Sequence, residues 1–275
     1  SWEHWSLITV WEWESVHAFD GPEATDDVRG GHFSVTADGA LMVNGYFRRE
    51  EAPGQSVTWL SDDGSAWSGP HVCPTGSNTW RWTVTWHDGV GYSVGYSGKD
   101  KDGALYRTFD GMNWEPLVQD LFPYSTVMKA NEAHLVFEED HTAYCLLRRD
   151  PRGEGTYATA LLGTAEPPYT QWSWQDLGVR MGGPRLVRLS DGRFLAAVRL
   201  YKGEWPRLAT ALCLIDVDKG TVEEVLDLPS GNDTSYAGVI EQDGVLWITY
   251  YSSHTGKASI YLAKVALPPN VTGPV

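Results

Sequence analysis

Residues 36–46, TADGALMVNGY, place an Asp-Gly turn between two apolar runs. Asp-Gly is a strong signal for a tight hairpin, and the flanking runs predict its two β-strands. The pattern recurs at residues 86–96 (WHDGVGYSVGY), 138–148 (EEDHTAYCLLR), 189–199 (LSDGRFLAAVR) and 241–251 (EQDGVLWITYY). The turn aspartates, 50, 52, 51 and 52 residues apart, are Asp38, Asp88, Asp140, Asp191 and Asp243. A repeat of this period predicts an array of similar structural modules.

Each module carries further runs rich in Val, Thr, Trp and Tyr, and helical periodicity is absent. Four-stranded meanders of about fifty residues predict an all-β fold, a five-bladed β-propeller in a single domain, residues 1–275. The expected blades span approximately residues 29–75, 78–120, 127–178, 182–230 and 234–268. The fifth contains only three strands, so the segment WSLITVWEW, residues 5–13, is expected to close it. A β-sandwich is the alternative fold.

Composition narrows the functional classes. The 275 residues include 21 basic and 36 acidic ones, a net charge of −15, which disfavours nucleic acid as a partner. No apolar run is long enough to cross a membrane, and no signal-peptide pattern is present. Three cysteines, an odd number, predict buried thiols and favour a cytoplasmic location, or secretion if a leader has been removed. Neither a metal site nor a cofactor is expected, because the eight histidines show no two-ligand spacing. The oligomeric state stays open.

Polar residues are expected to collect at one end of the blades. Residues about eight positions after each turn aspartate, and six to nine before it, return to the same end of their hairpin. Several cations gathered there are costly unless a ligand needs them, which predicts a binding site. The candidate substrate-binding residues are Arg29, Arg81, Arg148, Arg185, Arg199, Tyr251, Trp80 and His254.

Two further segments are SDDGSAW, residues 61–67, and TFDGMNW, residues 108–114, between the third and fourth strands of their blades. They resemble Asp-box turns, in which the aspartate binds local amides and the tryptophan packs between blades. With these turns and the order of its arginines, the chain resembles the exo-sialidase superfamily of β-propeller glycosidases, although that fold has six blades.

The resemblance implies an arginine triad for a sugar carboxylate, a tyrosine nucleophile activated by a glutamate, and an acidic residue in an early loop as general acid-base. It assigns Tyr236 as nucleophile, with Tyr251 as its substitute, and Glu132 as base. Glu50 and Asp27 are acid-base candidates, beside Glu51 and Asp26. A neutral phenol suits a carboxylated anomeric centre, which repels a carboxylate nucleophile.

The expected function is therefore a sialidase-like exo-glycosidase acting on a carbohydrate that carries a carboxylate. Two alternatives stay open. One is a uronate-directed glycosidase or polysaccharide lyase, and the other is a non-catalytic carbohydrate-binding propeller, because propellers support many functions.

Overall fold

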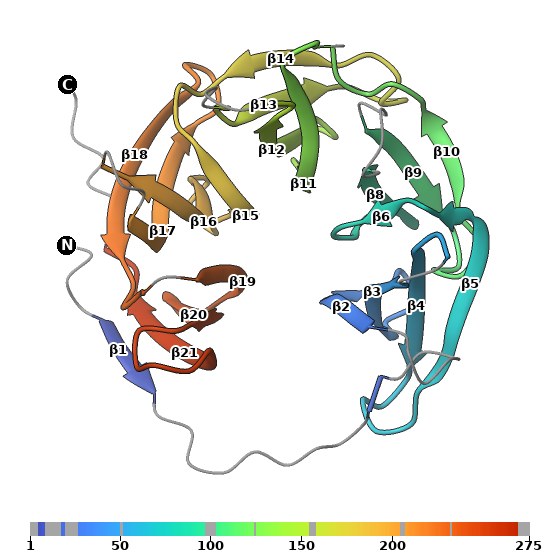
Figure 1. The fold of residues 1–275 in the computed structure, drawn as a ribbon, viewed down its shortest axis with the longest axis horizontal. Coiled ribbons are helices and arrows are strands. Elements are labelled where there is room, and N and C mark those ends of the chain that lie inside the picture. The colour runs from blue at the N-terminus through green and yellow to red at the C-terminus, as the bar shows by residue number, and fades with distance from the viewer. Residues whose placement is uncertain are drawn as a thin grey trace. The chain divides into compact units, whose positions relative to one another are not determined.

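The computed structural model describes residues 5–8, 18–19, 27–49, 52–96, 103–123, 125–153, 158–203, 207–231 and 233–268. The strands in these residues form five antiparallel sheets, the five blades of a β-propeller (Figure 1). The chain divides into two compact units, one made of residues 14–174 and the other of residues 1–13 with 175–275. No helix in the described residues is long and apolar enough to cross a membrane.

The unit of residues 14–174 contains three blades. The first comprises β2 (Asp27–Val35), β3 (Leu41–Arg48), β4 (Gln55–Ser61) and β5 (Ser68–Ser77). The second comprises β6 (Trp80–Arg81), β7 (Thr85–His87), β8 (Val90–Tyr96), β9 (Ala104–Thr108) and β10 (Glu115–Val118), where β6 and β7 both pair with β8. The third comprises β11 (Met128–Phe137), β12 (Ala143–Pro151), β13 (Leu161–Ala165) and β14 (Ser173–Asp176), in which the unit boundary falls.

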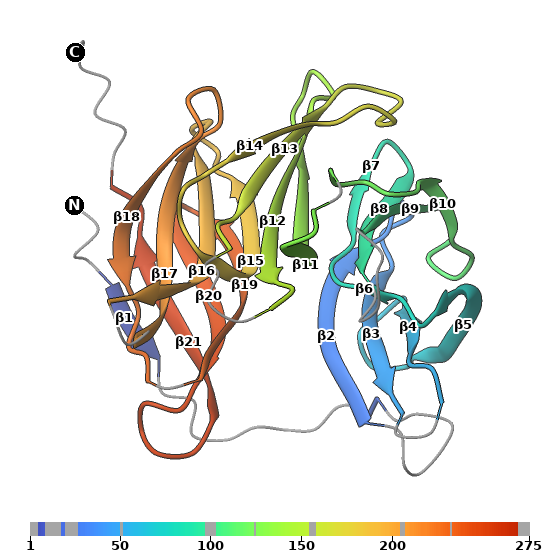
Figure 2. The same ribbon diagram turned by 45° about the horizontal axis from the view of Figure 1, so that its top comes forward.

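The other unit contains two blades. The fourth blade comprises β15 (Met181–Arg188), β16 (Phe194–Lys202), β17 (Arg207–Asp216) and β18 (Thr221–Asp227), whose long strands run side by side in Figure 2. The fifth comprises β19 (Thr234–Gln242), β20 (Val245–Ser252), β21 (Ser259–Ala266) and β1 (Trp5–Ile8). β1 pairs antiparallel with β21, Trp5 opposite Val265, which confirms that an N-terminal strand closes the last blade. Residues 9–13 of the expected segment lie outside the described residues.

Neighbouring blades within a unit pack their apolar faces together. In the larger unit, Val94 and Leu105 of the second blade share a buried cluster with Leu135 and Leu147 of the third. In the other unit, a comparable cluster joins the fourth blade to the fifth. Strands whose side chains alternate between the two faces of the sheet bury both faces in this way, which accounts for their high content of Val, Leu and aromatic residues.

The turns at residues 61–67 and 108–114 have the same local structure. Oδ1 of Asp63 accepts hydrogen bonds from the amides of Ser65 and Ala66, at 2.8 and 2.9 Å. Oδ1 of Asp110 likewise accepts from the amides of Met112 and Asn113, at 2.8 and 2.7 Å. The carboxylates thus supply acceptors for backbone amides that have no backbone partner in the turn, so both aspartates have a structural role.

The tryptophans of these two turns differ in burial. Trp114 is 5% exposed and packs between the first and second blades, whereas Trp67 is half-buried at the edge of the first blade. We expect Trp114→Ala to lower the free energy of unfolding by about 3–5 kcal/mol and Trp67→Ala by about half as much, because less apolar area is lost. Urea denaturation followed by circular dichroism measures both, and equal losses would contradict the assignment.

Candidate functional site

Each innermost strand carries one extra residue at the same place. The register shifts between Arg29 and His32, Ala130 and Ala133, Gly182 and Arg185, and Ser235 and Gly238, while β6 and β7 are interrupted between Arg81 and Thr85. Such β-bulges bend a strand and redirect its side chains, and they are common beside active sites. The predicted Glu132 and Tyr236 both occupy bulge positions, in β11 and β19. The sequence analysis did not anticipate the bulges.

The bulge of β19 is strained around Tyr236. Its φ of 55° lies in the left-handed region, which is unfavourable for a residue with a bulky side chain. Its neighbour Gly183, in the bulge of β15, has a φ of 55°, and a Cβ there would lie 2.9 Å from Cδ1 of Tyr236. A glycine is therefore needed at 183 for Tyr236 to take this position, 38% exposed.

A hydrogen-bonded triangle of Arg199, Asp233 and Tyr251 lies beside Tyr236. Tyr251 Oη donates to Asp233 Oδ1 at 2.7 Å, and Arg199 Nη2 donates to Tyr251 Oη at 2.7 Å. Arg199 Nη2 also contacts Asp233 Oδ1 at 3.2 Å, and its Nε donates to the Thr234 carbonyl at 2.7 Å. Arg199 is 9% exposed, whereas the Asp233 side chain is 68% exposed, so the triangle is open to solvent on the side of Asp233. Burial, aided by the hydrogen bond to Asp233, raises the pKa of Tyr251, which keeps the phenol protonated.

Two tyrosine rings lie together beside Arg199, and a second arginine, Arg185, belongs to β15 of the same unit. The rings of Tyr236 and Tyr251 are 5.5 Å apart, and the Arg199 guanidinium lies 5.6 Å from the Tyr236 ring. Arg185 Nε is buried and has no hydrogen-bond partner among the described residues, while burial lowers the pKa of Arg185. A buried donor without a partner is costly, and an anionic ligand would satisfy it. His254 Nδ1 lies 3.0 Å from Ser252 Oγ.

In the unit of residues 14–174, the candidate base Glu132 is fixed by an ion pair. Arg148 Nη1 donates to Glu132 Oε2 at 2.9 Å, and Arg148 Nε donates to Asp150 Oδ1 at 3.0 Å. The other oxygen of Asp150 accepts from the amide of Asn131, whose own Oδ1 accepts from the Glu132 backbone amide at 2.9 Å. The Glu132 side chain is only 4% exposed. This network holds the carboxylate in one orientation.

The other candidates of this unit lie apart from that network or are already engaged. Arg29 and Asp27 form an ion pair with each other, with about half of each side chain exposed. Trp80 stacks on Tyr46 with ring centroids 4.7 Å apart and on Tyr96 at 5.9 Å, so packing engages its ring. Glu50, like Glu51 and Asp26, lies outside the described residues. An acid-base role for Asp27 or Glu50 stays a prediction.

Arg81 is enclosed. It is 2% exposed, and its guanidinium lies 4.9 Å from the Trp114 ring and 5.8 Å from the Tyr106 ring. Nη2 contacts Cys73 Sγ at 3.7 Å, and burial lowers the pKa of Arg81. Sequence position placed this arginine at the end of an inner strand, but its side chain turns into the packing between two blades. In that place it stabilises the blades through cation–π contacts.

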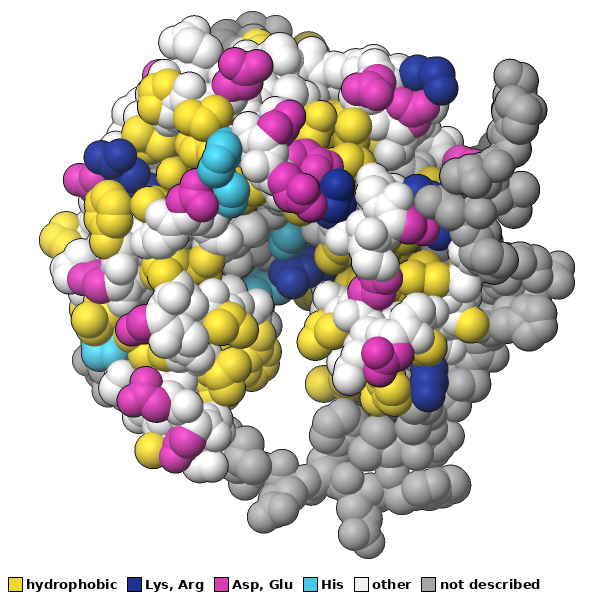
Figure 3. Space-filling view, turned by 180° about the vertical axis from the view of Figure 1, so that it is seen from behind, with side chains coloured by type: hydrophobic (Ala, Val, Ile, Leu, Met, Phe, Trp, Pro, Cys, Tyr) yellow, Lys and Arg dark blue, Asp and Glu magenta, His cyan; other side chains and the backbone are white. Residues whose placement is uncertain are grey.

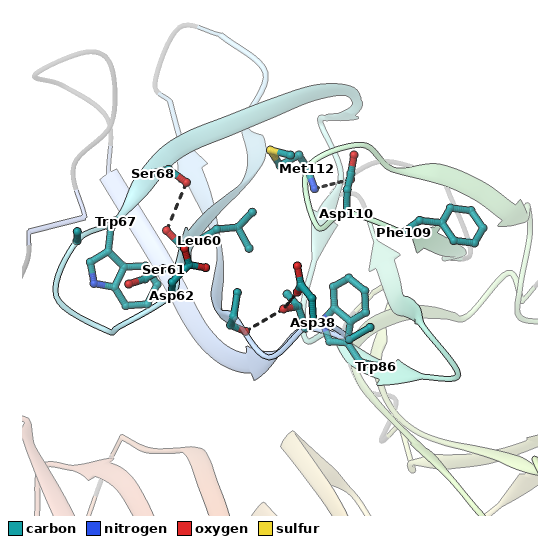
Figure 4. A pocket seen from close by; sticks show the side chains of 14 residues that line it. Asp38, Leu60, Ser61, Asp62, Trp67, Ser68, Trp86, Phe109, Asp110 and Met112 are labelled. Atoms are coloured by element: carbon teal, nitrogen blue, oxygen red, sulfur yellow. Dashed lines mark hydrogen bonds between the residues drawn. The ribbon is translucent and has the colours of Figure 1, made fainter.

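A pocket of about 670 Å³ lies at the Asp-Gly-turn end of the first two blades (Figure 4). Asp38, Asp62 and Asp110 line it, together with Trp67, Trp86 and Phe109. Asp38 accepts a hydrogen bond from Thr36, at 2.5 Å, and Asp110 holds its own turn, so two of these carboxylates are occupied structurally. An acidic lining repels an anionic sugar, so this pocket is unsuited to a carboxylated substrate.

Asp233 and Asp150 were missed by the sequence analysis, although Asp233 binds Tyr251 and Arg199 and Asp150 binds Arg148.

No model of a known protein family matches the sequence, and no curated protein matches it significantly. Among solved structures, a protein of unknown function from Dyadobacter fermentans is 16% identical, with a TM-score of 0.72 over 88% of this chain and 77% of that one. An endo-arabinase from Bacteroides thetaiotaomicron is 15% identical, with a TM-score of 0.64 over 88% and 95%. The β-1,2-mannobiose phosphorylase from Listeria innocua, in complex with β-1,2-mannobiose, is 14% identical, with a TM-score of 0.62 over 90% and 92%. At these identities the likeness is one of fold, the five-bladed β-propeller.

Proposed function

We propose that this protein is a glycosidase that cleaves a terminal sugar carrying a carboxylate, with Tyr251 as the reacting phenol and Asp233 as its base. The observation that carries the proposal is the triangle in which Tyr251 Oη lies 2.7 Å from both Asp233 Oδ1 and Arg199 Nη2. A nucleophile within hydrogen-bond reach of a base, with a third group orienting both, is the arrangement that covalent catalysis requires. The fold likeness to an arabinase and a mannobiose phosphorylase supports a carbohydrate substrate.

The chemistry follows from this geometry. Tyr251 Oη attacks the anomeric carbon, its proton passes to Asp233, and the bond to the leaving oxygen breaks as that oxygen takes up a proton from solvent. Water then attacks the anomeric carbon and releases one proton to solvent, while the phenolate leaves and takes back the proton held by Asp233. A neutral phenol avoids the repulsion that a sugar carboxylate exerts on a carboxylate nucleophile. The raised pKa of Tyr251 keeps the phenol neutral until the proton is transferred.

The preference for an anionic sugar rests on two arginines. Arg199 is largely buried beside the phenol, and the buried Nε of Arg185 has no partner among the described residues. A substrate carboxylate would supply the missing acceptor through a charge-assisted hydrogen bond. In a chain with a net charge of −15, these guanidinium groups create a local site for an anion that the overall charge repels.

The proposal is tested on a panel of aryl glycosides that includes sialosides, uronides and neutral arabinosides and mannosides. We expect release of the aryl group from an acidic glycoside, with retention of anomeric configuration, and at least about tenfold slower turnover when the sugar carboxylate is replaced by an amide, because a buried donor then loses its charged acceptor. Cleavage of neutral glycosides only would refute the acidic substrate. An unsaturated product absorbing in the ultraviolet would identify a lyase, and binding without turnover a carbohydrate-binding propeller.

A further inference from the structure

Three potential metal ligands from two hairpin turns meet on the surface of the unit of residues 14–174. His87 and Asp88 lie at the turn between β7 and β8, and His141 lies in the turn between β11 and β12. His141 Nδ1 is 3.0 Å from His87 Nε2 and 2.9 Å from Asp88 Oδ2, and His87 Nε2 is 3.5 Å from the same oxygen. Figure 3 shows histidine side chains beside carboxylates on the surface of the molecule.

Hydrogen bonds alone satisfy this triangle poorly. A neutral imidazole nitrogen carries either one proton or one lone pair, so His141 Nδ1 cannot both donate to Asp88 and accept from His87. If the His141 Nδ1 proton points at Asp88 Oδ2, His87 Nε2 at 3.0 Å receives at most a share of that same proton. A cation accepts all three lone pairs at once.

The distances fit a small divalent cation. Three atoms with these separations lie on a circle of radius about 1.8 Å, so a point about 2.0 Å from each exists slightly outside their plane, the usual length of zinc bonds to histidine and aspartate. We propose that His87, Asp88 and His141 bind a divalent transition metal of the Zn²⁺ class, with water at the remaining position. Two nitrogens and one oxygen disfavour Ca²⁺ and Mg²⁺, which prefer oxygen ligands.

Neighbouring groups hold the ligands in place. The His87 ring stacks on Phe137 with centroids 4.5 Å apart and planes 2° from parallel, and Tyr169 Oη donates to the His141 carbonyl at 3.0 Å. Such outer contacts orient metal-binding histidines. The side chains of His141 and Asp88 are 50% and 66% exposed, so an ion reaches the site from solvent.

The internal repeat singles out this position. His141 has a φ of 69°, at a place in the turn where the other four copies have glycine, two of them Gly39 and Gly192 with φ of 90° and 88°. A histidine with positive φ carries a cost that glycine avoids, and strained residues of this kind cluster at functional sites. The metal would join the second blade to the third through residues 54 positions apart.

Thermal unfolding with and without Zn²⁺ tests the site. With Zn²⁺ at about a hundred times its dissociation constant, we expect the midpoint to rise by about 5 °C and to fall back on adding EDTA. His141→Gly and Asp88→Asn should each weaken Zn²⁺ binding at least about tenfold in titration calorimetry. His141→Gly should fold well, because glycine suits the turn. Asp243→Asn is the matched control, since Asp243 has a φ of 52° in the equivalent turn, where Gln242 replaces His87.

Two results would overturn the proposal. One is a wild-type protein whose midpoint does not move with Zn²⁺ at millimolar concentration. The other is a shift that persists unchanged in His141→Gly and Asp88→Asn, which would place the ion elsewhere. In the wild type, Co²⁺ should develop the visible absorption of a site with nitrogen and oxygen ligands, and Ca²⁺ should leave the midpoint unchanged. Neither readout depends on the proposed glycosidase activity.

Discussion

Tyr251→Phe is expected to lower kcat on the best acidic glycoside of the panel by about a thousandfold or more, with little change in the free energy of unfolding. The substitution removes one oxygen, the atom that Asp233 and Arg199 both contact at 2.7 Å. Asp233→Asn should cause a comparable loss, because the amide cannot take the phenolic proton. Rates under single turnover measure the chemical step directly.

Tyr236→Phe is the matched comparison for this prediction. Tyr236 lies one strand away, its ring 5.5 Å from that of Tyr251, and the sequence analysis assigned it as the nucleophile. If Tyr251 reacts, Tyr236→Phe should alter KM more than kcat, since Tyr236 then only lines the site. The reverse result, a large kcat loss in Tyr236→Phe and a small one in Tyr251→Phe, would return the nucleophile to Tyr236. If both variants kept the wild-type kcat, neither tyrosine would be the nucleophile.

The blades were predictable because their signals are local. An Asp-Gly turn and its flanking strands lie within about eleven residues, and five copies at one spacing leave few alternatives to a propeller. The closing strand followed from counting, since a blade with three strands exposes an edge that another segment must cover. β1 paired with β21 confirms that argument.

The bulges were not predictable, because one extra residue in a strand alters the register without changing the hydrophobic pattern. Only glycines such as Gly183 hinted at them. Strand position also does not determine the direction of a side chain near a bulge, which explains Arg81: the pattern placed it at the end of an inner strand, whereas its guanidinium packs against Trp114.

Contacts between distant segments were also missed. Asp233 lies in a loop without any repeating pattern, and its contacts with Tyr251 and Arg199, 18 and 34 residues away, emerge only from the folded chain. His87 and His141 come from different hairpins, so the spacing of histidines in the sequence does not reveal that the structure brings three potential ligands together. Long-range pairing of this kind leaves no trace in a single sequence.

Arg148→Met is expected to lower the free energy of unfolding by about 3–5 kcal/mol, because it leaves the Glu132 carboxylate buried without its cation. The two side chains are 16% and 4% exposed, with Arg148 Nη1 2.9 Å from Glu132 Oε2. Adding Glu132→Gln to Arg148→Met should recover most of the loss, since a neutral amide tolerates burial better than a carboxylate. A double-mutant cycle by urea denaturation gives the coupling between the two residues.

The exposed pair of Arg29 and Asp27 provides the control for this cycle. Arg29→Met should lower the free energy of unfolding by less than about 1 kcal/mol, because the exposed Asp27 carboxylate stays hydrated when its partner is lost. An Arg148→Met loss no larger than this, or a double variant no more stable than Arg148→Met, would show that the Glu132 charge is not held by Arg148.

If the cycle behaves as expected while Glu132→Gln alone lowers kcat, Glu132 has a second role beyond the ion pair, since the amide still accepts a hydrogen bond from Arg148. If kcat is unchanged, the base is not Glu132, and Asp233 stays the base for Tyr251.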